Sequence, residues 1–137
     1  MRAVPLALLA LTLSIMPLRA DDAVSAARAT IQAQIEAFLS GDDAAAYAHA
    51  APSIQRMFPN QDIFMRMVRE GYAPVHRPQS YEFGQGESDG AGAVVQRVEL
   101  TGPDGRGYEA VYTLQLQPDG SYRITGVHLR ASTMLGT

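Results

Sequence analysis

The sequence VVQRVEL at residues 94–100, followed by YEAVYTLQL at residues 108–116, decides the fold class. In each run one set of alternate positions is mostly apolar and the other mostly polar, the period of a strand with one buried face. Gly-Pro-Asp-Gly at 102–105 and Pro-Asp-Gly at 118–120 supply the residues of tight hairpin turns. The spacing therefore predicts consecutive antiparallel strands joined by short turns.

Two further strands flank this pair. Tyr81 and Phe83 alternate with Glu82 on the first. On the last, apolar residues hold even positions at 122 and 124 but odd positions at 127 and 129. Because one face cannot change parity in a regular strand, we expect a bulge at Gly126 that bends this strand.

The first half of the chain has a helical period instead. One stripe on a single helix consists of Val24, Ala27, Ile31, Ile35 and Phe38. Gly41 is expected to end that helix, and Asp42 or Asp43 to cap a second one through residues 44–50. Pro52 suits the first turn of a short helix that ends near residues 58–59.

A clearer helix is expected from the cap Asn60 to Gly71. Its buried side is predicted to consist of Ile63, Phe64, Met67 and Val68. Residues 72–78 contain two prolines and are predicted to be extended and irregular. Helices followed by a four-stranded meander define an α+β fold, in which N-terminal helices pack on a curved, cone-shaped antiparallel sheet. A ligand would occupy the space between the two layers.

Residues 1–20 have the three parts of a signal peptide. Arg2 is followed by an almost wholly apolar run to Met16, and Pro17-Leu18-Arg19-Ala20 ends on a small residue suited to cleavage. The alternative is a membrane anchor, but the run is shorter than the ~20 residues needed to cross a bilayer. We therefore expect a single domain at residues 21–137, periplasmic or secreted, with no stable membrane anchor after cleavage.

Composition excludes several classes of function. Without residues 1–20, nine arginines face fourteen carboxylates, a formal charge of −5 that argues against nucleic acid as a partner. The chain has no cysteine and no lysine, so thiolate, disulfide and Schiff-base chemistry are excluded. No cofactor is predicted.

Several segments resemble a known family. They are Ile31-x-x-Gln34-Ile35-x-Ala37-Phe38, Ala51-Pro52-x-Ile54-Gln55-x-x-Phe58 and Phe64-x-x-Met67-Val68-Arg69-x-Gly71-Tyr72-x-x-Val75-x-Arg77-Pro78. In these segments the chain resembles an exported bacterial family, domain of unknown function 4864. The resemblance covers nearly all of residues 21–137 and implies an architecture similar to nuclear transport factor 2. It implies no activity.

Candidate ligand contacts are tyrosines expected to face the hollow and residues of the most specific block: Tyr47, Met67, Arg69, Tyr72, Arg77, Tyr108 and Tyr112. A tyrosine offers an apolar ring and a hydroxyl that needs a partner when buried. An arginine at the mouth of a cavity suits an anion. The competing interpretation makes the tyrosines core residues, and makes Arg69 and Arg77 partners of Glu70, Asp62 or Asp42.

No catalytic or metal-binding residue is predicted. Gly86-Glu87-Ser88-Asp89-Gly90 matches the Gly-x-Ser-x-Gly pattern of a nucleophile elbow, but a strand follows it, so it is predicted to be a loop. The histidines at 49, 76 and 128 form no metal-ligand pair in sequence. Glu99 and Glu109 have the outward parity, so no strand carboxylate is expected inside the cone.

The leading hypothesis is a non-enzymatic domain whose tyrosine-lined pocket holds a small apolar or anionic ligand. One alternative is an isomerase or hydrolase of the same fold that uses a carboxylate or His49 as its base. Another is a protein-interaction module that uses the outer face of the sheet. A homodimer formed through that face is also expected.

Overall fold

The computed structural model describes residues 19–132 and, before them, residues 2, 3, 5, 7, 10 and 12. Most of the expected signal peptide therefore lies outside the described residues. Helices precede strands along the chain, in the order α1 (Ala20–Ser40), α2 (Asp43–Ala48), α3 (Pro52–Met57), α4 (Gln61–Gly71), α5 (Ala73–His76), β1 (Ser80–Ser88), β2 (Ala93–Thr101), β3 (Gly107–Leu116) and β4 (Tyr122–Ala131).

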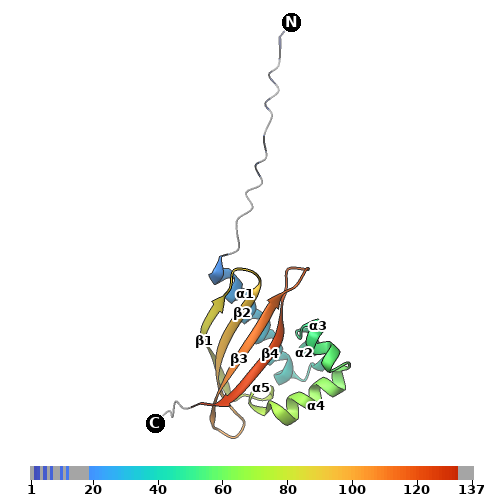
Figure 1. Cartoon of the computed structure of the whole chain (residues 1–137), viewed down its shortest axis with the longest axis vertical. Helices are drawn as coiled ribbons and strands as arrows, with labels where there is room; N and C mark the ends of the chain where they lie inside the picture. Colours follow the sequence, from blue (N-terminus) through green and yellow to red (C-terminus); the bar gives the residue numbers. More distant parts are fainter. Residues whose placement is uncertain are drawn as a thin grey trace.

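The four strands form one antiparallel sheet in the order β1-β2-β3-β4, and the helices lie on one side of it (Figure 1). The predicted α+β fold class is confirmed. Both predicted hairpin turns are present, with Gly105 at φ 78° and Gly120 at φ 86°, where a residue with a side chain would be strained. Among the described residues, no helix is long and apolar enough to cross a membrane.

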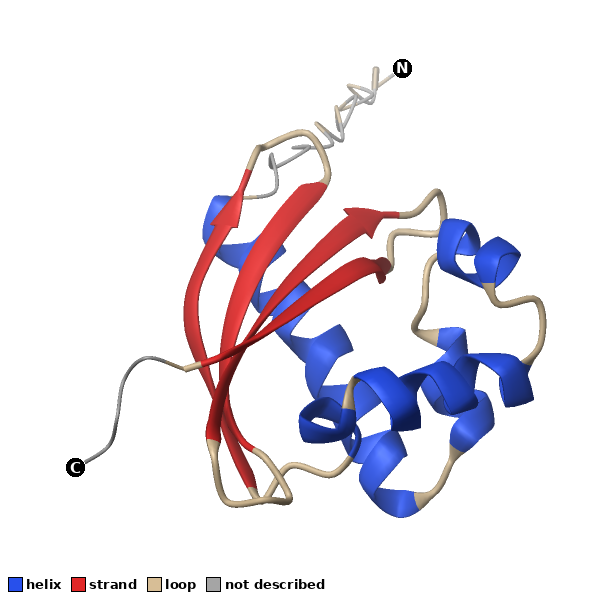
Figure 2. Ribbon diagram, turned by 60° about the horizontal axis from the view of Figure 1, so that its bottom comes forward, coloured by secondary structure: helices blue, strands red, loops and turns tan. Residues whose placement is uncertain are grey.

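Helix α1 covers the inner face of the sheet. Ile31, Ile35 and Phe38 are buried along the predicted stripe, and the helix runs across the sheet in contact with β1, β2 and β4 (Figure 2). It ends at Gly41, whose φ of 75° and backbone N–H close the last turn as expected. The stripe therefore fixes which face of the sheet becomes the interior.

The caps of the shorter helices also agree with the sequence. The carboxylate of Asp42 accepts a hydrogen bond from the Ala45 N–H at 3.1 Å, and Asn60 Oδ1 accepts one from the Ile63 N–H at 2.9 Å. Pro52 occupies the first turn of α3, where no N–H is required. These local signals divide residues 41–71 into three short helices with defined ends.

Four details of the prediction are wrong. Residues 73–76 form a one-turn helix, because Pro74 sits in its first turn and the N–H groups of residues 75–77 bond back to Tyr72 and Ala73. Ile63 is 40% exposed and Met65 is buried in its place. Leu116 is exposed at the end of β3. The predicted loop at 86–90 is strand as far as Ser88, and the turn begins afterwards.

The bulge predicted near Gly126 is confirmed. Thr113 pairs with Gly126 and Leu114 with Ile124, which leaves Thr125 as the extra residue of β4. The extra residue turns both Ile124 and Val127 toward the helices, which explains the change of parity in the sequence. A second bulge, at residues 84–85 of β1, was not predicted.

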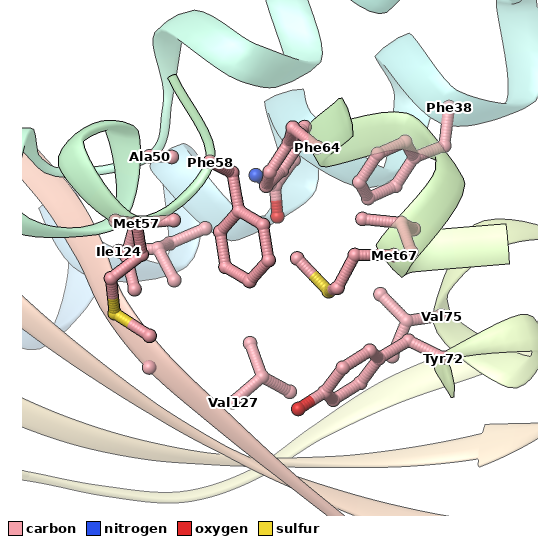
Figure 3. A pocket seen from close by; sticks show the side chains of 14 residues that line it. Phe38, Ala50, Met57, Phe58, Phe64, Met67, Tyr72, Val75, Ile124 and Val127 are labelled. Atoms are coloured by element: carbon pink, nitrogen blue, oxygen red, sulfur yellow. The ribbon is translucent and has the colours of Figure 1, made fainter. Parts of the chain in front are cut away.

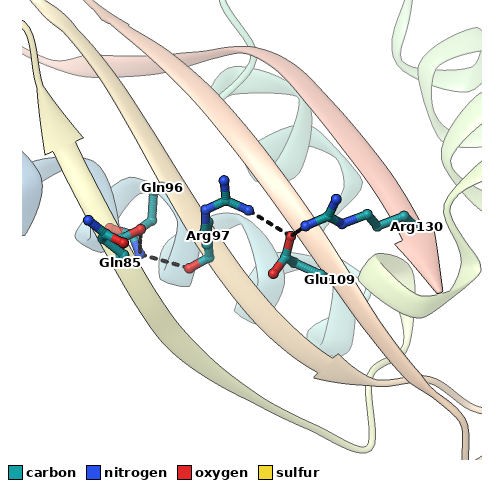
Figure 4. Close-up of polar contacts among 5 residues, drawn as sticks. All are labelled: Gln85, Gln96, Arg97, Glu109 and Arg130. Carbon is teal, nitrogen blue, oxygen red and sulfur yellow. Dashed lines mark hydrogen bonds and ion pairs between the residues drawn. The ribbon is translucent and has the colours of Figure 1, made fainter. Parts of the chain in front are cut away.

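A buried glutamine fills the second bulge. Gln96 is fully buried on β2, and its amide N–H groups donate to the carbonyls of Gly84 (2.9 Å) and Arg97 (2.8 Å). Its Oε1 accepts a hydrogen bond from Arg28 Nε of α1 at 2.9 Å. Figure 4 shows Gln96 between β1 and the Arg97 carbonyl. The inner face under α1 is therefore closed by a saturated polar network inside an apolar core.

Candidate functional site

The segment between α2 and α3 is hydrogen-bonded to β4, an edge strand of the sheet. The Ala51 N–H donates to the Ile124 carbonyl at 2.8 Å, and the Ile124 N–H donates to the His49 carbonyl at 2.9 Å. This short parallel bridge at Ala50 holds α3 beside β4. An opening remains between β4, α1 and the short helices.

That opening is a cavity of about 240 Å³. Its walls come from α1, from the helical segment between residues 50 and 75, and from β4. The lining residues are Gln34, Phe38, Ala50, Ile54, Met57, Phe58, Phe64, Met67, Val68, Tyr72, Val75, Ile124, Gly126 and Val127. In Figure 3, Phe58 and Met67 point into the space from the helical side and Val127 faces them from β4. The bulge in β4 is what gives Val127 this direction.

The lining is apolar apart from two side chains. Gln34 is only 4% exposed, and its Nε2 donates to the Ala46 carbonyl at 3.0 Å. Tyr72 is half-buried, and its hydroxyl points toward Val127 in Figure 3. None of the lining residues carries a charge or an imidazole. Such a site can bind by hydrophobic contact and one or two hydrogen bonds, and it has no group that exchanges a proton near neutral pH.

Of the predicted contact residues, Met67 and Tyr72 line the cavity together. Tyr47 stands behind its wall: the hydroxyl donates to the Phe58 carbonyl at 2.6 Å, and the ring centroid lies 5.3 Å from that of Phe64. It therefore supports two lining residues without lining the cavity itself. This position matches the structural alternative for a core tyrosine.

The two strand tyrosines lie elsewhere. Tyr112 is fully buried opposite Gln96, where burial, and then Tyr81, hold the pKa of its hydroxyl well above the ordinary value. Tyr108 lies at the far end of β3 and donates to Asp104 Oδ2 at 2.6 Å. That hydrogen bond raises the pKa of the phenol. Neither side chain lines the cavity.

The two arginines of the most specific block are exposed outside the cavity. Arg77 donates to the Leu39 carbonyl at 2.9 Å and so connects the end of α5 to the end of α1. This role resembles the structural alternative, with a backbone carbonyl in place of the expected carboxylate. No guanidinium reaches the cavity lining to neutralise an anion.

The histidines do not converge either. Burial, followed by the charge of Arg123, lowers the pKa of His49; burial, followed by Arg77 and Arg69, lowers that of His76. His76 packs edge-on against Phe38 at 5.7 Å and stays outside the lining. Within the described part of the chain, no three acidic, histidine or cysteine side chains are placed to hold a metal ion.

Sequence reasoning missed Gln34 as a cavity residue. It follows Ile31 by three positions and precedes Phe38 by four, which places it on the buried face of α1. A polar residue on an apolar stripe is the signal that could have identified it. Met57 and Phe58 were unpredictable, because their place depends on the bridge between Ala50 and β4.

Fold and cavity together define a class: a small α+β domain with an open antiparallel sheet and an uncharged, mostly apolar cavity at its free edge. The chain belongs to the family described as Domain of unknown function (DUF4864), whose model matches residues 20–137. Comparison with curated proteins and with solved structures gave no match. The likeness to nuclear transport factor 2 stays a prediction.

Proposed function

We propose that this domain binds a small, uncharged and mostly apolar molecule in the cavity between β4 and helices α3 to α5. The observation that carries the proposal is a cavity of about 240 Å³ whose fourteen lining residues are eleven apolar residues and one glycine beside Gln34 and Tyr72. A cavity of about 150 Å³ is already enough for a benzene-sized guest. An empty apolar space of this size otherwise costs packing energy.

The lining favours an apolar ligand over an anionic one. An unpaired carboxylate in an apolar site loses its hydration, and no lining residue returns an opposite charge. It also favours binding over chemistry, because neither a carboxylate nor His49 contributes to the lining. An isomerase or hydrolase working here would lack a general base.

The test is a thermal-shift and native mass spectrometry screen with small aromatic and short-chain aliphatic compounds. Val127→Phe would fill the cavity from β4, and we expect it to abolish binding of every compound that binds the parent. Val95→Phe is the matched control, since Val95 is 41% exposed and does not line the cavity. Equal responses from the parent and Val127→Phe would contradict the proposal.

We further propose that the domain acts after export to the periplasm or medium. Support comes from the signal-like pattern of residues 1–20 and from the start of α1 at Ala20, because cleavage after Ala20 removes only the first residue of that helix. Intact-mass analysis of the chain expressed in a bacterium should give a protein that begins at Asp21. An uncleaved chain in the cytoplasmic fraction would contradict it. The homodimer stays a prediction, which the molar mass of the domain from light scattering would test.

A further inference from the structure

Beside the Tyr72 hydroxyl, the lining offers one further polar side chain, that of Gln34. Gln34 is 4% exposed as a residue and lines the cavity. Its partner, the Ala46 carbonyl, can only accept a hydrogen bond, so the group that faces it at 3.0 Å must be the NH₂. The orientation of the amide is thereby fixed, and the oxygen is the remaining polar atom.

That oxygen accepts no hydrogen bond from the described residues, 19–132 included. Glutamine Oε1 has two acceptor sites, and a ligand that covers this oxygen without donating to it would leave an acceptor without a partner, at a cost comparable to a lost hydrogen bond. Gln96, the other buried glutamine, has both ends of its amide occupied by protein groups. Gln34 is therefore a built acceptor in an otherwise apolar lining.

From this we infer that the ligand carries a neutral hydrogen-bond donor, such as a phenol or alcohol hydroxyl, which it presents to Gln34 Oε1. The inference rests on the proposed function and narrows it to one class of compound. A carboxylate would place an acceptor against an acceptor, and a pure hydrocarbon would leave the oxygen unpaired. Tyr72 can add a second hydrogen bond at the sheet side, since its hydroxyl both donates and accepts.

The experiment compares two probes of nearly the same shape, para-ethylphenol and para-ethyltoluene, by NMR titration of the parent. We expect the phenol to bind about tenfold more tightly, the effect of one neutral hydrogen bond. In Gln34→Met, which keeps the length of the side chain, this preference should fall to near unity. In Tyr72→Phe it should be largely retained.

A measurement on the parent protein tests the inference even if the variant fails to fold. In the parent, the side-chain amide resonances of Gln34 should shift on addition of the phenol and move much less with ethyltoluene, while those of Gln96 stay in place. Gln96 is the internal control because its amide is already saturated.

The outcomes separate the two proposals. Equal binding of both probes, or a preference that survives in Gln34→Met, would overturn the assignment of Gln34 while leaving an apolar cavity in use. A preference lost only in Tyr72→Phe would assign the donor contact to Tyr72 and also overturn it. If neither probe bound, and the wider screen gave no compound sensitive to Val127→Phe, the proposed function itself would fail.

Discussion

The two buried glutamines of this domain, Gln34 on α1 and Gln96 on β2, differ in how their amides are satisfied. Gln96 lies under α1, where Arg28 and two carbonyls of the sheet engage both ends of its amide. Gln34 lies beside the cavity, where only its NH₂ has a protein partner. A saturated buried amide stabilises a fold, whereas a half-satisfied one beside an open cavity is available to a ligand. The same residue type thus separates a structural region from the region where we propose that a ligand binds.

The largest effect on stability is expected from a change that disrupts the hydrogen bonds of Gln96. A Cβ at Gly86 would lie 2.2 Å from Gln96 Oε1 and 2.6 Å from Val24 Cγ1. Gln96 cannot swing away without losing its hydrogen bonds, so Gly86→Ala should lower the free energy of unfolding by about 2 to 3 kcal/mol. Urea unfolding measures this directly.

The control for that change is Gly71→Ala. A Cβ at Gly71 meets nothing within 4 Å, and its backbone is helical. Alanine there should be neutral or stabilising by up to about 1 kcal/mol. If the two variants unfolded at the same urea concentration, the saturated network would not be what closes the bulge in β1. That result would remove the physical basis of the comparison.

The role of Gly86 also shows where sequence reasoning reached its limit. Alternation in residues 94–100 and 108–116, with the two proline-glycine turns, was enough to predict the sheet, and the change of parity between residues 124 and 127 predicted the bulge at Gly126. Gly86 stood out only as part of a Gly-x-Ser-x-Gly pattern, because the need for glycine arises from Val24 and Gln96, which are distant in sequence. Local pattern cannot report a contact of that kind.

The candidate site could likewise be predicted only in part. A hollow between helices and sheet follows from the order of elements, and Met67 and Tyr72 follow from the buried side and end of α4. The cavity's place at β4 does not, because it depends on the bridge that Ala50 makes with Ile124. Tyr112 has the inward parity that was predicted, yet it is fully buried in the core and lies outside the cavity lining.

A smaller effect on stability is expected at Tyr112, whose hydroxyl is buried near Gln96 and lacks a hydrogen-bond partner among the described residues. Removing an unpaired buried hydroxyl relieves its desolvation cost, so Tyr112→Phe should raise the free energy of unfolding by about 1 kcal/mol. Calorimetric unfolding is the measurement. A clear loss of stability would mean that the hydroxyl has a stabilising partner and would contradict the interpretation that it is unpaired.

The smallest effect on stability is expected on the outer face of β2 and β3, where charged side chains interact across the strands. Glu99 pairs directly with Glu109, and Glu109 forms ion pairs with Arg97 and Arg130 (Figure 4). Burial, and then the hydrogen bond with and charge of Glu109, raise the pKa of Glu99. Burial also acts to raise that of Glu109, but Arg130, Glu99 and Arg97 outweigh it, so its pKa is lowered.

These opposite shifts give opposite dependences of stability on pH. A carboxyl group whose pKa is raised by folding destabilises the fold increasingly as pH rises through its folded pKa, because the folded chain holds the proton more tightly. A group with a lowered pKa contributes stability above its unfolded pKa and loses it as pH falls through the folded one. Glu99→Gln removes the titration of Glu99, while the glutamine amide can still donate a hydrogen bond to Glu109 as the protonated Glu99 does. The variant should therefore match the parent near about pH 3 and exceed it by a few tenths of a kcal/mol at neutral pH.

Glu87→Gln is the control for this change, because it removes the same charge from β1 outside the Glu99–Glu109 pair. Its stability relative to the parent should change less between acidic and neutral pH than that of Glu99→Gln. If the two variants showed the same dependence, the gain would come from lowering the net charge of the whole chain. The difference between the two curves thus isolates the cross-strand repulsion between Glu99 and Glu109, which Arg97 and Arg130 outweigh for Glu109 and only partly offset for Glu99.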